Sequence, residues 1–174
     1  MGLAIKISSP GPVFFKQKRS GEDGREFWCY KFRSMRVNAQ CDTLQATEHD
    51  PRKTRIGDLI RKTNVDELPQ FINVLKGDMA LIGPRPLLVQ YLPLYSKEQA
   101  RRHDVRPGIT GWAQVNGRNA ISWTKKFELD VWYVDHCSFW LDVKIIFLTI
   151  KKVFVREGIS QEGQATMEFF TGNN

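Results

Sequence analysis

The sequence is poor in the residues that most often build metal centres and covalent cross-links, with three cysteines and three histidines among 174 residues. Cys29, Cys41 and Cys137 are odd in number and widely spaced, so they form neither a disulfide framework nor a CxxC metal site. The histidines show no metal-ligand spacing among themselves or with the cysteines. We therefore expect a reducing compartment and no zinc site.

Long apolar runs are absent as well. No stretch is long enough to span a bilayer, and the sequence shows no signal-peptide pattern, internal repeat or low-complexity linker. A hydrophobic content of 41% with 11% aromatic residues nevertheless excludes a disordered chain. The length predicts one domain that buries a substantial core.

Acidic residues are outnumbered by basic ones, 19 to 26, which gives a formal net charge of +7. A basic surface favours anionic partners, whether nucleic acid, phosphorylated substrates or an acidic membrane. A nucleic-acid-binding module would suit the aromatic and basic runs "FFKQKR" and "FWCYKFR". Since no RNA-recognition, zinc-finger or helix-turn-helix pattern supports that class, we expect no nucleic-acid partner.

Residue patterns predict a β-hairpin followed mainly by helices. Aromatic-rich strands at 13–19 and 26–33 flank the turn residues 21–24. Helical spacing begins near Ile56 and resumes in a second helix whose apolar positions are Leu68, Phe71, Ile72 and Leu75. The remaining predicted segments are a polar loop at 38–54, a glycine-rich loop at 107–119, and helices at 123–136 and 139–156.

Asp66 and Glu67, in "TNVDELPQ", have two interpretations. Acids in a first helical turn complement the helix dipole, and Asn64 with Glu67 resembles a capping box, which favours a structural role. A glycosidase pair fits poorly, because neighbouring side chains on a helix diverge by about 100°. A single nucleophilic carboxylate that forms an acyl phosphate is chemically reasonable, because a helix N-terminus would bind the phosphate under attack.

Arg85 stands out among the basic residues because it lies between two prolines in "GPRP". The prolines restrict its backbone and pre-position its guanidinium for an oxyanion, whereas a solvated surface charge explains most other basic residues. In the loop "PGITGWAQVNGRN", three glycines allow a ligand to approach the backbone and Trp112 is suited to stack on a base or sugar. An ordinary turn-rich connection explains the same loop pattern.

The stretch "FWLDVKIIFLTIKKVF" is apolar over most of a helical circumference, with lysines placed to reach lipid phosphates. Six uncharged residues, 145–150, separate Lys144 from Lys151, which is too few to cross a membrane. A helix lying on a membrane surface and a core helix with a charged edge both fit this pattern.

Four stretches, in order, resemble motifs of one family: "SPGPVFFKQKR", "YKFRSM", "DELPQFINVLKGDMALIGPRP" and "RPGITGWAQVNGRN". They are similar to the bacterial sugar transferases, the monotopic phosphoglycosyl transferases, and most of all to the compact bacillosamine-type members. The resemblance implies transfer of a sugar-1-phosphate from a UDP-sugar, of an N-acetylated hexosamine or bacillosamine type, to polyprenyl (undecaprenyl) phosphate. It also implies UMP release, a requirement for Mg²⁺ and a place at the start of bacterial polysaccharide or protein glycan assembly.

The same resemblance implies residue roles. Asp66 would be the nucleophile, form a covalent phospho-aspartyl intermediate and face Mg²⁺, while Glu67 would assist in proton handling or in holding the metal. The residues that would bind the phosphates and the nucleotide are Lys31, Arg61, Arg85 and Arg118. Phosphoryl transfer depends on positioning and charge neutralisation, and a carboxylate among so many cations should keep a low pKa.

We therefore expect a helix-rich α/β (α+β) domain with an N-terminal β-hairpin and amphipathic helices on the cytoplasmic face of a bacterial inner membrane. Family members carry a re-entrant membrane helix before "SPGPVFF", of which this chain keeps "GLAIKI". The expected parts are a remnant of that helix at 1–8, a catalytic domain at 9–158 and a C-terminal tail at 159–174. The alternatives are a basic nucleic-acid-binding module and an inactive, anchor-less homologue that serves as a scaffold, and the oligomeric state is open.

Overall fold

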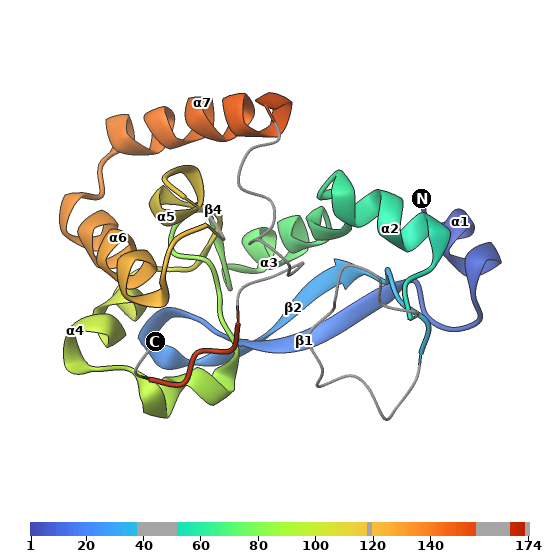
Figure 1. Ribbon diagram of the computed structural model, residues 1–174, viewed down its shortest axis with the longest axis horizontal. Helices are drawn as coiled ribbons and strands as arrows, with labels where there is room; N and C mark the ends of the chain where they lie inside the picture. The colour runs from blue at the N-terminus through green and yellow to red at the C-terminus, as the bar shows by residue number, and fades with distance from the viewer. Residues whose placement is uncertain (38–51, 118–119, 156–167, 173–174) are drawn as a thin grey trace.

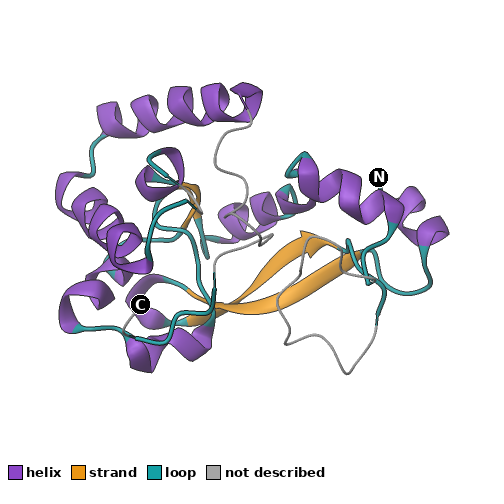
Figure 2. Ribbon diagram, viewed as in Figure 1, coloured by secondary structure: helices purple, strands orange, loops and turns teal. Residues whose placement is uncertain are grey.

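The computed structural model describes residues 1–37, 52–117, 120–155 and 168–172 (Figure 1). Within these ranges the chain runs from helix α1 through a β-hairpin, a helical middle and a pair of parallel strands to two long helices (Figures 1 and 2). The short elements away from the site are α1 (Gly2–Ser8), η1 (Glu22–Gly24), η3 (Val89–Leu94), α4 (Lys97–Ala100) and η4 (Arg101–His103). This mixture confirms the predicted helix-rich α/β class.

Strands β1 (Phe14–Ser20) and β2 (Glu26–Phe32) form the predicted antiparallel hairpin. Side chains alternate between the two faces of a strand, and the register pairs Gln17 with Cys29. Arg19, Cys29 and Lys31 therefore share one face of the hairpin. That face forms one wall of the candidate site.

The helical middle begins as predicted but differs around the two acids. Helix α2 (Arg55–Lys62) starts where the Thr54 hydroxyl accepts a hydrogen bond from the Gly57 amide. Asn64 is then left-handed (φ 56°), η2 (Val65–Glu67) makes one 3-10 turn, and α3 (Gln70–Lys76) begins after Pro69. Because proline has no amide hydrogen, it interrupts the helical ladder.

The predicted capping box is consequently wrong. The acids occupy a turn ahead of the α-helix, and the Asn64 side chain caps none of its amides. Helix α3 is instead tied to the hairpin by Asn73, which is fully buried. Its side chain accepts from the Tyr30 amide at 3.1 Å and donates to the Trp28 carbonyl at 2.7 Å, so it fixes the helix to the open edge of β2.

The predicted glycine-rich loop contains regular structure. Strand β4 (Gly108–Thr110) pairs in parallel with β3 (Ala80–Ile82), and α5 (Trp112–Val115) follows directly. A Cβ on Gly108 would lie 2.1 Å from the Gly83 nitrogen, so this glycine allows two backbones to touch. The expectation that it opens the backbone to a ligand is therefore wrong for Gly108.

The helices α6 (Trp123–His136) and α7 (Phe139–Val155) agree with the predicted segments within one residue. They close two separate hydrophobic cores. One is an aromatic cluster to which the C-terminal Phe170 contributes, with Leu87, Tyr91, Trp123 and Phe127. The other joins the parallel strands to the two helices through Ile82, Val115, Tyr133 and Ile145.

Large apolar side chains remain exposed on two helices. The apolar positions of the second predicted helix are exposed: Leu75 on α3 is 89% exposed, Phe71 and Ile72 of the same helix are exposed too, and so is Leu68, which lies just before the helix. Helix α7 has a buried side with Ile145 in the core, as the predicted core helix requires, and an exposed apolar side on which Trp140 is 78% exposed. No helix in the described part of the chain is long and apolar enough to cross a membrane.

Candidate active site

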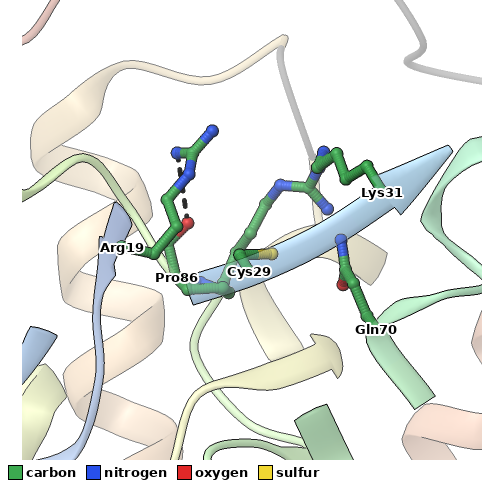
Figure 3. Close-up of a pocket in the computed structure, with 6 residues that line it drawn as sticks. Arg19, Cys29, Lys31, Gln70 and Pro86 are labelled. Atoms are coloured by element: carbon green, nitrogen blue, oxygen red, sulfur yellow. Dashed lines mark hydrogen bonds between the residues drawn. The ribbon is translucent and has the colours of Figure 1, made fainter. Parts of the chain in front are cut away.

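Three segments far apart in the sequence meet at the inner face of the hairpin. Strand β2 contributes Lys31, the turn η2 contributes Glu67, and the turn after β3 contributes Arg85. The adjoining pocket is lined by Arg19, Cys29, Lys31, Gln70, Arg85 and Pro86 (Figure 3). The sequence-predicted residues Lys31, Glu67 and Arg85 are thus brought together.

Glu67 links the two cations. The Lys31 ammonium donates to one carboxylate oxygen at 2.6 Å, and the Arg85 guanidinium donates to both oxygens, with Nη1 at 3.1 Å from Oε2. Burial acts to raise the pKa of Glu67, but the charges and hydrogen bonds of Arg85 and Lys31 outweigh it and hold the pKa well below its usual range. Glu67 therefore stays ionised and orients both cations.

Asp66 differs from its neighbour. Its half-buried carboxylate makes no hydrogen bond or ion pair within the ranges that the structure describes. Burial raises the pKa of Asp66, and the repulsion by Glu67 adds to this effect, while Lys31, Arg61 and Arg85 counteract it. The expected low pKa is therefore wrong for Asp66, because removal from water outweighs the surrounding cations.

The backbone of Arg85 is held by a residue that the sequence does not reveal. Arg102 is 2% exposed; its Nη2 donates to the Arg85 carbonyl oxygen at 2.8 Å and to the Asp130 carboxylate at 2.8 Å. Asp130 is buried as well, at 3% exposure, and receives a second hydrogen bond from Nε. Arg102 lies outside any recognisable motif, and arginine side chains are usually exposed to solvent, so no sequence pattern indicated that this one is buried.

The remaining predicted residues have different positions. Arg61 lies in the last turn of α2, close enough to Asp66 to favour its ionised form. Arg118 lies outside the described residues. Trp112 stacks on Trp132 with ring centroids 4.9 Å apart, and the Lys144 ammonium lies 5.4 Å from its ring centre, so its indole is already engaged within the protein.

A magnesium ion fits the donor set at Asp66. Mg²⁺ in phosphoryl-transfer sites is held by one or two carboxylates together with substrate phosphates and water. Asp66 offers a carboxylate that no cation of the described chain occupies. No cluster of three or more His, Cys, Asp or Glu side chains able to hold a metal is found among the described residues.

Comparisons with known proteins find similar sugar transferases. The chain is 59% identical over 171 residues to the uncharacterized sugar transferase EpsL of Bacillus subtilis, a match that covers 98% of this chain and 83% of EpsL. It is 47% identical over 166 residues to a UDP-glucose:undecaprenyl-phosphate glucose-1-phosphate transferase of Escherichia coli, covering 90% of this chain and 36% of that protein. An Aeromonas hydrophila enzyme named for N-acetylgalactosaminephosphotransferase activity on undecaprenyl phosphate is 48% identical over 163 residues.

The coverage differs among these relatives. The chain spans most of EpsL but little more than a third of the E. coli transferase and 38% of the A. hydrophila enzyme. The model of the bacterial sugar transferase family matches residues 1–156, which include all of the pocket and the Asp66–Glu67 turn. The chain belongs to the bacterial sugar transferase family.

Proposed function

We propose that the protein is a phosphoglycosyl transferase that moves a sugar-1-phosphate from a UDP-sugar to polyprenyl phosphate and releases UMP. The observation that carries this proposal is the carboxylate of Asp66, which has no partner among the described residues and lies near the cations Lys31 and Arg85 that Glu67 holds in place. Family relatives are named for this chemistry with glucose and with N-acetylgalactosamine. We expect an N-acetylated hexosamine or bacillosamine type of sugar here.

The first step is attack by a carboxylate oxygen of Asp66 on the phosphorus that carries the sugar. A bond forms between Asp66 and that phosphorus, the bond to the uridine-bearing phosphate breaks, and UMP leaves with the electron pair. Because Asp66 has no hydrogen-bonding partner in the described chain, its oxygens need not break a contact before attack.

The second step transfers the sugar phosphate to the lipid. An oxygen of polyprenyl phosphate attacks the same phosphorus, and the bond to Asp66 breaks, which restores the carboxylate. Lys31 and Arg85 neutralise charge on the phosphate oxygens in both steps, and Arg61 adds a further positive charge near Asp66. Glu67 keeps both cations oriented and, with its depressed pKa, is unsuited to carry a proton.

When bound, Mg²⁺ would be held by Asp66 together with phosphate oxygens and would neutralise the negative charge of the diphosphate. Every other role in the proposed reaction rests on residues of the chain.

Exposed apolar side chains support a position at a membrane surface. The turn that contains Asp66 leads directly into α3, whose exposed Phe71, Ile72 and Leu75 are suited to contact lipid tails. Helix α7 presents Phe139 and Trp140 in the same way. A lipid-borne acceptor would thus meet the protein close to the reactive carboxylate. We place this surface on the cytoplasmic leaflet, which faces the compartment where UDP-sugars are made.

The proposal is tested by UMP release from a panel of UDP-sugars with polyprenyl phosphate and Mg²⁺ in detergent or lipid nanodiscs. The panel holds N-acetylated sugars beside glucose and galactose. The variant is Asp66→Asn, and its control is Asp58→Asn, which removes an exposed carboxylate paired with Lys62 on α2. We expect UMP release by the native chain and by Asp58→Asn, and none by Asp66→Asn; equal release by all three would refute the nucleophile, and no release with any sugar would favour the scaffold alternative.

A further inference from the structure

The pocket beside Glu67 contains two polar side chains to which neither the sequence motifs nor the proposed reaction gives a role. They are Arg19 on β1 and Gln70 at the start of α3 (Figure 3).

Arg19 is a cation without an acidic partner in the described chain. Its guanidinium donates to the Gln17 side-chain oxygen at 2.6 Å and to the Pro86 carbonyl at 3.4 Å, and both acceptors are neutral. Lys31 and Arg85, the other cations of the pocket, share the single carboxylate of Glu67. The pocket thus holds three positive charges beside one ion-paired acid.

Gln70 points its amide into the same pocket (Figure 3). The residue is 3% exposed, and its side chain makes no hydrogen bond with any other residue that the structure describes. Buried amides normally have partners, because an unsatisfied donor loses its hydration without compensation. An amide on the wall of a cationic pocket, without a partner among the described residues, is placed to donate to a ligand.

Both features indicate an anion. A partly buried guanidinium next to a second guanidinium is costly unless a negative charge joins them, and burial together with Arg85 lowers the pKa of Arg19. Arginine forks match the oxygens of phosphate, and a neutral amide adds a further donor. We infer that Arg19 and Gln70 bind a phosphate group of the nucleoside diphosphate donor, the one that leaves with the nucleoside.

This assignment rests on the proposed function, and it follows from where the charges lie. In the proposed reaction Asp66, Lys31 and Arg85 contact the phosphate under attack, and Arg19 lies further along the same hairpin face. The two phosphates of a diphosphate are bridged by one oxygen, so the second must occupy an adjoining position. A cation there would neutralise the charge that develops on the leaving phosphate.

The test is ligand binding by the complete chain, measured by calorimetry and by the shift of the thermal midpoint. The variants are Arg19→Gln and Gln70→Met, and the control is Arg25→Gln, which removes an exposed arginine of the same hairpin. The ligands are UDP, UMP, uridine and a short-chain polyprenyl phosphate. Loss of a charge-assisted contact should weaken UDP binding at least tenfold in Arg19→Gln and less in Gln70→Met, with the control unchanged.

A structural role for Arg19 makes a different prediction. If it only stabilised the fold, Arg19→Gln would lower the thermal midpoint without ligand, whereas an anion site predicts an unchanged or higher midpoint and a smaller rise on adding UDP. Unaltered UDP affinity in Arg19→Gln would overturn the inference, as would a loss confined to polyprenyl phosphate or a lower midpoint with normal UDP binding.

Failure of the inference and failure of the proposed function are distinguishable. Sugar-phosphate transfer that persists while Arg19→Gln binds UDP normally removes the anion site and leaves the function in place. If Arg19→Gln weakens UDP binding tenfold while the native chain transfers no sugar phosphate, the anion site stands and the proposed function fails.

Discussion

Replacing Glu67 with glutamine should lower the free energy of unfolding more than breaking any exposed ion pair among the described residues. The carboxylate accepts from Lys31 and twice from Arg85, with side-chain exposures of 15%, 20% and 39% for Glu67, Lys31 and Arg85. Without the negative charge, the two cations face each other uncompensated. Breaking a fully buried pair costs about 3–5 kcal/mol, and the partial exposure of Arg85 reduces this to about 2–3 kcal/mol.

Urea unfolding at pH 7 measures this loss. With a slope of about 2 kcal/mol per molar urea, Glu67→Gln should lower the midpoint by about 1 M without changing the slope. The control is Glu26→Gln, which removes the acid of an ion pair 2.7 Å long between exposed side chains on the same hairpin. That variant should stay within about 1 kcal/mol of the native protein.

The effect also has a pH dependence of known sign. The folded protein depresses the pKa of Glu67, so its contribution is fully present above the unfolded value of about 4.3 and is lost as the pH falls towards the folded value. The difference between native and Glu67→Gln protein should therefore shrink below pH 4. A midpoint equal to that of Glu26→Gln at pH 7, or a difference independent of pH, would refute the reasoning.

Three further variants probe other parts of the site and fold. Arg85→Lys should lower kcat/KM for UMP release by about tenfold or more, because a point charge replaces a two-pronged contact; normal kinetics would contradict this role. Burial and Arg102 lower the pKa of His103 to about 4. As the pH falls from 6.5 to 4, the unfolding free energy of the native protein should therefore fall relative to that of His103→Gln, by at most about 1.4 kcal/mol per pH unit. A difference between the two proteins that stays constant with pH would exclude the effect. Gly108→Ala should lower unfolding free energy by about 3 kcal/mol in urea, since its Cβ would lie 2.1 Å from the Gly83 nitrogen, and a tolerated alanine would mean that the strands separate easily.

Local sequence patterns predict those elements whose cause is local. Aromatic-rich segments around a glycine-containing turn predicted the hairpin, and helical patterns predicted α2, α6 and α7 within a residue or two. The parallel pairing of β3 with β4 was not predictable, because it depends on contact between segments more than twenty residues apart. The apolar stripe of α3 indicated a helix correctly, although periodicity alone could not show that the stripe faces outward.

In the candidate site, too, local motifs were predictable and contacts between distant segments were not. The motif resemblance selected Asp66, Glu67, Lys31 and Arg85, and the structure brings the last three into contact. The motif could not show that Glu67 is ion-paired while Asp66 has no partner in the described part of the chain, because the two acids are adjacent and chemically alike. The place of Arg19 in the pocket and the buried pair of Arg102 with Asp130 were missed, because both depend on contacts between distant parts of the chain.

The nucleophilic role of Asp66 is tested most directly by intact-protein mass spectrometry. The chain is incubated with a UDP-sugar that it turns over and Mg²⁺, without polyprenyl phosphate, then quenched and digested to locate any adduct. The account predicts a mass increase of one sugar phosphoryl group on the peptide that contains Asp66, its loss on adding polyprenyl phosphate, and no adduct in Asp66→Asn. UMP release with no adduct on Asp66, or an adduct that persists in Asp66→Asn, would contradict it.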